Sequence, residues 1–319
     1  MIMNKCIALA VLAAMLASCS NDITHESPSL RVKASVNGAH YTSSDEAFVP
    51  GDVIGISSLE GLEYRNVPYV CGSDGTFAAQ KTPISLRGDE ELTFSAYYPY
   101  NADLIDGGRI CHTVSADDQL PANQGGIDFL YARGSKASAA FPVLNFTGDN
   151  AFRHCMSLIE IDLCDGEGVS LDGNLVSFSL SGIYLKGSFE PVEGVAMADD
   201  SSAPGELEIA IADVQTDTID GQCFYKLPTV ILFPQGGTGS FTLKVKANEQ
   251  SADSIEKELR TYTAELSVPS VIADAGECPG LVSGYKYRYR VRVSKGAAPS
   301  GLARSQVQDS PTVEVLIWR

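Results

Sequence analysis

The start of the chain carries the clearest chemistry, that of a lipid anchor. Lys5 precedes a short apolar run that ends in Leu16-Ala17-Ser18-Cys19 and is followed by polar residues. This is a signal-peptide layout, and the run is too short to span a bilayer comfortably. A cysteine after Leu-Ala-Ser is typical of a lipobox. There the thiol takes a diacylglyceryl group and the freed amine takes a further acyl chain such as palmitate, and two or more chains hold firmly. We expect residues 1–18 to be a lipoprotein signal peptide and Cys19 to be lipidated; the alternative is an ordinary secretory signal with a chance cysteine.

No other residue pattern indicates a catalytic or metal site. The four histidines lack a His or Cys partner at metal-ligand spacing. His154 precedes Cys155, but neighbours on a strand point to opposite sides. The sequence contains no G-x-S-x-G elbow, P-loop or H-E-x-x-H motif. We therefore expect a protein that is not an enzyme and that uses no cofactor and no metal.

Six cysteines follow Cys19, and none of them forms a C-x-x-C pair, so neither zinc nor a thioredoxin-like redox site is indicated. Export would permit disulfides, and an even number favours at least one. The alternative is single buried thiols that pack as small hydrophobic groups. The six are Cys71, Cys111, Cys155, Cys164, Cys223 and Cys278.

The charge balance of the chain excludes one class of partner. Lys and Arg number 23 against 40 Asp and Glu, which gives a net charge of −17. Phosphate binding needs clustered Lys and Arg, so we expect no nucleic acid partner. The acidity fits an exposed protein that must stay soluble beside an anionic cell surface.

The elements that would position these residues are β-strands, because apolar and polar residues alternate along the whole chain. Tyr285–Val293, Y-K-Y-R-Y-R-V-R-V, alternates strictly, which places one face in a core and the other in water. Leu92–Tyr98 is rich in aromatic and β-favouring residues. Many short strands with turns between them predict an all-β fold of sandwiches rather than a parallel α/β sheet. Further strands are expected near 30–36, 53–57, 141–146, 158–163, 176–185, 206–211 and 262–268.

The composition of two segments predicts how neighbouring parts of the chain are connected. Residues 133–140 are small, polar and poorly patterned. They predict a linker between an N-terminal β-sandwich domain, 19–140, and a C-terminal β-sandwich domain with a tail strand, 141–319. The runs 230–233 and 241–245 flank a Gly-rich loop, which predicts a β-hairpin.

Short motifs are spread along nearly the whole chain, and their order and spacing are more specific than any one of them. They are structural: Pro50-Gly51-Asp52 is a turn that enters a strand, and the aromatic run 94–100 fills a core. The motifs are Cys19, 48–56 (FVPGDVIGI), 64–69 (YRNVPY), 94–100 (FSAYYPY), 128–132 (DFLYA), 144–146 (LNF), 152–161 (FRHCMSLIEI) and 284–287 (GYKY). In these motifs the chain resembles the fimbrillin family, the Mfa-like fimbrial (pilus) subunits of gut and oral Gram-negative bacteria.

The resemblance implies two transthyretin-like β-sandwich domains and an exported lipoprotein of the outer membrane and cell surface. It also implies a fimbrial subunit, or an anchor, tip or accessory protein, that supports cell adhesion. Assembly would be by β-strand addition: a protease removes the first strand, and a neighbour's donor strand fills the groove. Partners would be other fimbrial subunits, outer-membrane lipid through acylated Cys19, and a host or bacterial surface ligand. The alternative is a non-polymerising, lipid-anchored adhesin that binds glycan or host protein through loops at a sandwich end.

The chain departs from the family where the maturation cut is expected. In the family this cut follows an Arg in the loop after the first strand, but here that loop, Tyr41–Ala47, contains no Arg or Lys. Arg31 is the nearby candidate for proteolytic processing, although it lies at the start of the first strand. A cut there would release the lipid anchor and leave most of residues 30–36 in place, which favours an anchor, tip or accessory subunit.

The end of the chain predicts one more strand, at 312–319. Val313, Val315 and Ile317 share one face at period two. An exposed apolar strand is an aggregation hazard and must be paired somewhere. It either folds back to complete its own second domain or inserts into the next subunit as a donor strand.

Overall fold

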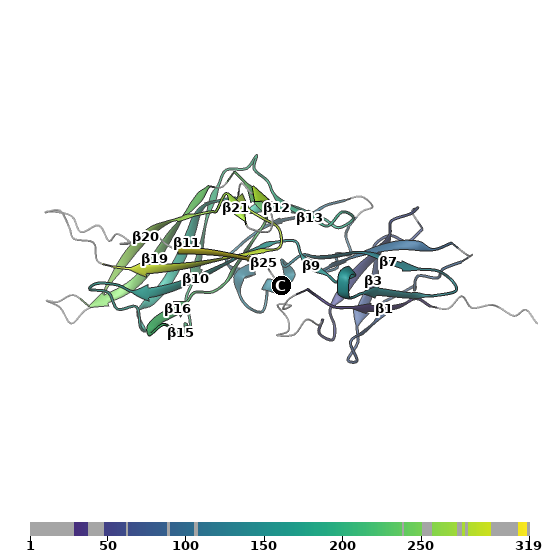
Figure 1. Cartoon of the computed structure of the whole chain (residues 1–319), viewed down its shortest axis with the longest axis horizontal. Helices are drawn as coiled ribbons and strands as arrows, with labels where there is room; N and C mark the ends of the chain where they lie inside the picture. Colours follow the sequence, from purple (N-terminus) through teal and green to yellow (C-terminus); the bar gives the residue numbers. More distant parts are fainter. Residues whose placement is uncertain are drawn as a thin grey trace, which may run out of the picture.

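The computed structural model describes residues 29–37, 48–61, 63–87, 90–104, 108–237, 239–250, 257–272, 276–277, 280–294 and 312–317. Their regular structure is nearly all strand, with three short 3₁₀ helices, η1 Asp117–Gln119, η2 Gln124–Gly126 and η3 Gly148–Asn150. The predicted all-β fold is therefore confirmed. Figure 1 shows two β-bodies that lie end to end along the longest axis. We refer to the body that contains β1 as the first lobe and to the body that contains β24 as the second lobe.

The first lobe is an eight-stranded sheet in the order β8-β1-β4-β3-β2-β5-β7-β9. It curls around a core of aromatic and aliphatic side chains, in which the Phe48 ring meets those of Phe77, Tyr98 and Phe152 edge-on at centroid distances of 5.4, 5.6 and 5.1 Å. Each such pair adds roughly 0.5–1.5 kcal/mol beyond its buried area. The strands are β1 Arg31–Ala34, β2 Val53–Ser58, β3 Val67–Cys71, β4 Thr76–Ala79, β5 Leu92–Tyr98, β7 Leu130–Ala137, β8 Val143–Phe146 and β9 Arg153–His154.

The second lobe packs two main sheets against each other. One has the order β15-β16-β10-β24-β25, with β17 also paired to β10, and the other has the order β14-β11-β19-β20. Across the interior, the Phe241 and Tyr289 rings meet edge-on at 5.6 Å, and the Tyr289 hydroxyl donates to the Ser267 carbonyl at 3.2 Å. The inward face of Tyr285–Val293 is fully buried at Tyr287 and Tyr289, as its alternation predicts.

The strands of these two sheets are β10 Ser157–Asp165, β11 Leu175–Ile183, β14 Gly205–Ala210, β15 Gln215–Ile219, β16 Gln222–Lys226, β17 Val230–Leu232, β19 Ser240–Gln250, β20 Lys257–Ser267, β24 Tyr285–Val293 and β25 Thr312–Ile317. A three-stranded sheet covers one side, formed by β6 Ile110–Thr113, β12 Lys186–Glu190 and β13 Val195–Ala198. Two short pairs complete the lobe, β18 Gln235–Gly236 with β23 Gly280–Leu281 and β21 Val271–Ile272 with β22 Gly276–Glu277.

Strand pairing differs from the expected division of the chain at residue 140. The expected linker, 133–140, is wrong, because most of it belongs to β7, where Ser135 and Ala137 are buried. Small side chains weakened its alternation, yet Ser135 Oγ accepts a hydrogen bond from Asn145 N–H of β8 at 2.7 Å. Both β8 and β9 lie after residue 140 and pair within the first lobe, while β6 lies before it and pairs with β12 of the second. We therefore propose a domain boundary just after His154.

The predicted hairpin around the Gly-rich loop is also wrong. Its first strand, β17, pairs with β10 in one main sheet, whereas β19 pairs with β11 and β20 in the other. The loop crosses from one sheet of the sandwich to the opposite one. A hairpin and a sheet-to-sheet crossing use the same strand, glycine and strand pattern, so local sequence does not separate them.

The five described cysteines are free thiols. Cys71, Cys155 and Cys164 are buried, and burial raises the pKa of the Cys155 thiol far above its usual range. Cys111 and Cys223 are exposed. Cys278 lies outside the described residues. No disulfide joins the five described cysteines, and the three buried ones match the alternative of separately packed thiols.

Candidate functional site

The first strand occupies a slot between two other strands of the first lobe. On one side β1 pairs in parallel with β8, from Arg31 opposite Val143 to Ala34 opposite Phe146. On the other side it pairs antiparallel with β4, with Val32 opposite Phe77. Because both edges are hydrogen-bonded, β1 is an interior strand despite its position near the start of the chain.

The inward side chains of this segment belong to the core of the lobe. Leu30, Val32 and Val36 are 4%, 1% and 1% exposed. Beyond β1, the backbone continues to pair: Phe152 N–H donates to the Ser35 carbonyl at 2.9 Å, and Asn37 N–H donates to the Phe152 carbonyl at 2.8 Å. Burial of three aliphatic side chains contributes roughly 4.5–9 kcal/mol at about 1.5–3 kcal/mol each. Removal of this segment would leave an apolar groove exposed to water, which is strongly unfavourable.

Arg31, the candidate processing residue, is the first residue of β1, and its side chain is exposed. Its backbone N–H donates to the Pro142 carbonyl at 3.0 Å, and the next residue, Val32, is part of the ladder with β4. A protease binds its substrate as an extended, unpaired segment. The Arg31–Val32 bond therefore becomes accessible only when β1 leaves its slot. The loop 41–47 lies outside the described residues, as does Cys19.

The last strand occupies a different kind of position. β25 pairs antiparallel with β24 from Tyr285 opposite Ile317 to Arg290 opposite Thr312, and in the described part of the chain β24 is its only partner. Val313, Val315 and Ile317, the candidate donor residues, stand opposite Tyr289, Tyr287 and Tyr285. The tail thus extends the second lobe's own sheet in this structure, at its edge.

Ionic contacts hold β24 to β10 independently of the tail strand. Glu160 accepts hydrogen bonds from Lys286 Nζ at 3.0 Å and from Arg288 Nε at 2.8 Å. Burial raises the pKa of the Glu160 carboxyl, but the hydrogen bonds and charges of Lys286 and Arg288 outweigh it and hold that pKa below its usual value. The parallel pairing of β10 with β24 also extends over eight residue pairs.

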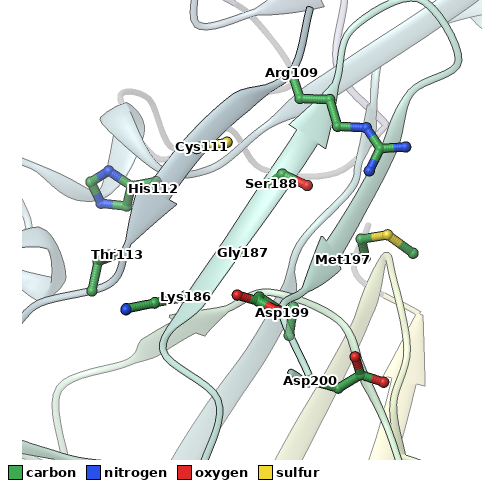
Figure 2. Close-up of a pocket in the computed structure, with 11 residues that line it drawn as sticks. Arg109, Cys111, His112, Thr113, Lys186, Gly187, Ser188, Met197, Asp199 and Asp200 are labelled. Carbon is green, nitrogen blue, oxygen red and sulfur yellow. The ribbon is translucent and has the colours of Figure 1, made fainter. Parts of the chain in front are cut away.

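A hollow of ≈ 610 Å³ on the outer face of β6, β12 and β13 gathers thiol, imidazole and carboxylate groups (Figure 2). Cys111 and His112 are neighbours on β6, and Figure 2 shows the sulfur and the imidazole on opposite sides of the strand. His112 Nε2 lies 3.0 Å from Asp118 Oδ2, so the partner of the His112 imidazole is the Asp118 carboxylate. Burial raises the pKa of Asp118, but hydrogen bonds from Ser115 and His112 lower it overall. Cys111 and His112 are therefore not a thiol–imidazole pair.

Among the residues that the structure describes, no group of three or more His, Cys, Asp or Glu side chains is placed to hold a metal ion. Within the same residues, no helix is long and apolar enough to cross a membrane. The two terminal strands of the described chain differ in how they are held: β1 is paired on both sides, and β25 is paired with β24.

Comparison with known proteins identifies the family to which this chain belongs. The fimbrillin-like family profile matches residues 40–315, which is most of the sequence. The chain belongs to the fimbrillin-like family. Membership in this family supports a fimbrial or adhesion-related role at the cell surface, with other fimbrial subunits as partners.

Solved structures share the fold of this fimbrillin-like protein. One is a candidate cell adhesion protein from Bacteroides ovatus, which is 22% identical, covers 92% of this chain and 98% of its own, and has a TM-score of 0.61. Another is a candidate cell adhesion protein from Bacteroides uniformis, which is 21% identical, covers 91% of this chain and 98% of its own, and has a TM-score of 0.59. A search of curated proteins found no significant match.

Sequence reasoning found the two strands of this fimbrillin-like chain but missed the residues that hold the first one. The parallel partner β8 and the bridging residue Phe152 come more than a hundred residues later in the chain. The only local signal was the alternation of Leu144-Asn145-Phe146, which indicates a strand but not its partner.

Proposed function

We propose that this fimbrillin-like chain is a fimbrial subunit of the anchor, tip or accessory kind, assembled by β-strand addition and supporting cell adhesion. The observation that carries the proposal is β1, a short strand that fills a groove with Leu30, Val32 and Val36 and is hydrogen-bonded on both sides. Main-chain hydrogen bonds give such a groove affinity for any suitable strand, and alternate side chains give it specificity. A slot of this kind can accept a strand from a neighbour when its own strand leaves.

We propose further that this chain keeps β1. Cys19, as the lipidated residue, would connect the outer membrane to β1 through about ten residues, which reach at most ~35 Å. A cut after Arg31 would sever the lipid and still leave Val32–Val36 in the slot. A subunit whose first groove stays filled accepts no donor there, so it belongs at an end of a fimbria or beside it. Its own edge strand, β25, would be the part that it offers to a neighbour.

The anchor is tested by replacing Cys19. Cys19→Ala should abolish labelling by a radioactive fatty acid and release the protein from membranes. The matched control is Cys6→Ala, which changes a cysteine inside the expected signal peptide and should leave labelling intact. Undiminished labelling of Cys19→Ala would contradict the lipoprotein assignment.

Retention of β1 is tested by tying it in place. Lys33 and Thr76 are opposite each other in the β1–β4 ladder, and both are exposed. The double variant Lys33→Cys, Thr76→Cys, oxidised, should enter fimbriae as the native protein does, seen as ladders on a gel run without reduction or heating; Lys33→Cys alone is the control. Loss of incorporation, restored by a reductant, would show that β1 must leave and that the chain is a stalk subunit. Absence of ladders in the native protein would contradict polymerisation.

A second candidate function is that of a non-polymerising, lipid-anchored adhesin. It is favoured by one observation: both β1 and β25 are paired within their own chain, so the monomer completes both of its lobes. This candidate predicts surface binding of a glycan or a host protein by monomers, with no ladder under any redox condition.

A further inference from the structure

A hollow lies where the two lobes meet, and both lobes supply its walls. Its volume is ≈ 480 Å³, which is within the range of small-ligand sites, roughly 300–1,000 Å³. Asn37, Tyr131, Arg133 and Arg153 come from the first lobe. The turn Glu193-Gly194 and the segment Ser283–Tyr285 come from the second. We refer to it as the interlobe hollow.

Two guanidinium groups stand on one side of the interlobe hollow. Arg153 on β9 is directly opposite Tyr131 on β7, and Arg133 lies two residues further along β7, so all three side chains share one face of the sheet. Arg133 Nη1 contacts Glu193 Oε2 at 3.3 Å, with both side chains about half exposed at 50% and 54%. In the part of the chain that the structure describes, no carboxylate pairs with Arg153. The hollow is therefore locally basic on a chain whose net charge is −17.

The opposite wall is held close to this face. Tyr131 Oη donates to the Val192 carbonyl at 2.7 Å, so the turn between β12 and β13 is tied to β7. Gly194 has φ +69°, and a Cβ placed there would overlap the Tyr131 ring. Only glycine permits this approach, because any side chain would push the two lobes apart. The backbone fixes the separation of the walls before any ligand arrives.

The third wall adds polar groups and a second aromatic ring. The Ser283 hydroxyl donates to the Cys155 carbonyl at 3.0 Å, and Gly284 N–H donates to the Met156 carbonyl at 2.8 Å, which fixes this segment against the start of β10. Tyr285 is half-buried beside it. The hollow thus combines aromatic surface, an amide at Asn37, a carboxylate at Glu193 and two guanidinium groups on a rigid frame.

We propose that the interlobe hollow binds an acidic sugar unit of a surface glycan, with the sugar carboxylate between Arg133 and Arg153. A planar guanidinium donates two parallel hydrogen bonds to a carboxylate, which a neutral sugar cannot accept with the same strength. Glu193 and Asn37 line the same hollow and can bond sugar hydroxyls, and the half-buried ring of Tyr285 offers an apolar surface to the sugar ring. This inference deepens the proposed adhesion role and rests on it for its biological meaning, although binding by purified protein requires neither anchor nor polymer.

The test is isothermal calorimetry of the full mature chain with trigalacturonate, and with neutral trigalactose as the matched ligand. Saturable binding of trigalacturonate should be at least tenfold tighter than that of trigalactose. Arg153→Gln and Arg133→Gln should each weaken the binding of trigalacturonate tenfold or more. Arg153→Lys should recover only part of the lost affinity. A ligand that bridges both lobes should also raise Tm, because it binds only the folded state.

The chain offers a close control. Arg109 contacts Glu190 at 3.3 Å with side-chain exposures of 55% and 33%, nearly the geometry of Arg133 with Glu193, but it lies outside the interlobe hollow. Arg109→Gln should leave affinity unchanged. Equal binding of both trisaccharides, undiminished binding by a folded Arg153→Gln variant, or equal competition by inorganic phosphate would overturn the proposal. None of these results bears on the ladders that test polymerisation, so the two proposals fail separately.

Discussion

The two ends of the described chain are held in contrasting ways. β1 is an interior strand, paired with β8 and β4, and its segment places Leu30, Val32 and Val36 in the core. β25 is an edge strand whose described partner is β24 alone. An interior strand cannot leave without opening the core, whereas an edge strand can leave and expose one row of backbone groups. The difference indicates which end a fimbrillin-like subunit can release with the smaller loss of stability.

This contrast has a consequence for assembly. In the proposed assembly, the strand that a subunit offers is the one whose loss leaves a stable sheet, and β24 has a long parallel partner in β10 and ion pairs to Glu160. In the first lobe, by contrast, loss of β1 separates β8 from β4. If β1 leaves, another strand must fill the groove, because the apolar core of the first lobe would otherwise be exposed to water. Four changes test the contrast between β1 and β25, and the largest loss of stability is expected in the slot of β1.

The most damaging change is expected inside the β1 slot. Val32→Asp would bury an unpaired carboxylate in the first core and should lower the free energy of unfolding by about 4 kcal/mol or more, or unfold the first lobe outright. The matched control is Lys33→Asp, an exposed neighbour on the other face of the same strand. Denaturant titration followed by far-ultraviolet circular dichroism measures both. Similar stabilities for the two variants would show that β1 is not an interior strand.

A smaller loss is expected when the edge strand is removed. Deletion of residues 310–319 removes the hydrogen bonds of one ladder with β24, and the monomer should remain folded. Its free energy of unfolding should fall by roughly 2–4 kcal/mol, because a few hydrogen bonds are lost at about 1 kcal/mol net each. Thermal unfolding measures the change, and a truncation at 318 serves as the control. Collapse of the second lobe would place β25 in the same class as β1 and remove the contrast.

The ion pairs between β10 and β24 should have an intermediate to small effect. Glu160→Gln leaves Lys286 and Arg288 without their carboxylate and should cost about 2 kcal/mol at pH 7. Since the pKa of Glu160 is lowered in the folded state, its contribution is present above the ordinary value near 4.5 and is lost as the pH falls through the lower, folded-state pKa. Stability curves of the native protein and Glu160→Gln should therefore converge in acid. A constant difference down to about pH 2 would contradict this origin.

The mildest change is expected at the exposed start of β1. Arg31→Gln should change stability by no more than ~0.5 kcal/mol, because the side chain is exposed and no described carboxylate pairs with it. Trypsin should leave the Arg31–Val32 bond of the folded native protein intact and cut it only after unfolding. Mass spectrometry of the fragments measures this, and cleavage after Lys257, the first residue of β20, is the internal reference for cleavage at the start of a strand. Rapid cleavage at Arg31 in the folded protein would show that β1 opens readily.

Much of this architecture was predictable from local pattern. Leu92–Tyr98 and Tyr285–Val293 are strands with the predicted bounds, because alternation and aromatic content act within a few residues. The linker predicted at residues 133–140 was wrong, since alanine and serine give a weak alternation whatever their burial. The interlobe hollow could not be predicted from the sequence, because Arg133, Arg153 and Glu193 come together only when strands from both lobes are in place.

The class of fold and the family were therefore already specified by the amino-acid sequence: period-two alternation requires sheets with one buried face, and the fimbrillin-like profile matches residues 40–315. Which strands are neighbours became visible only in the folded chain. There β1 pairs with β8 in parallel, the Gly-rich loop passes from one sheet to the other, and β1 is interior while β25 is an edge. The physical reason is that backbone hydrogen bonds are nearly independent of side chain, so pairing between distant segments is selected by how the whole core packs.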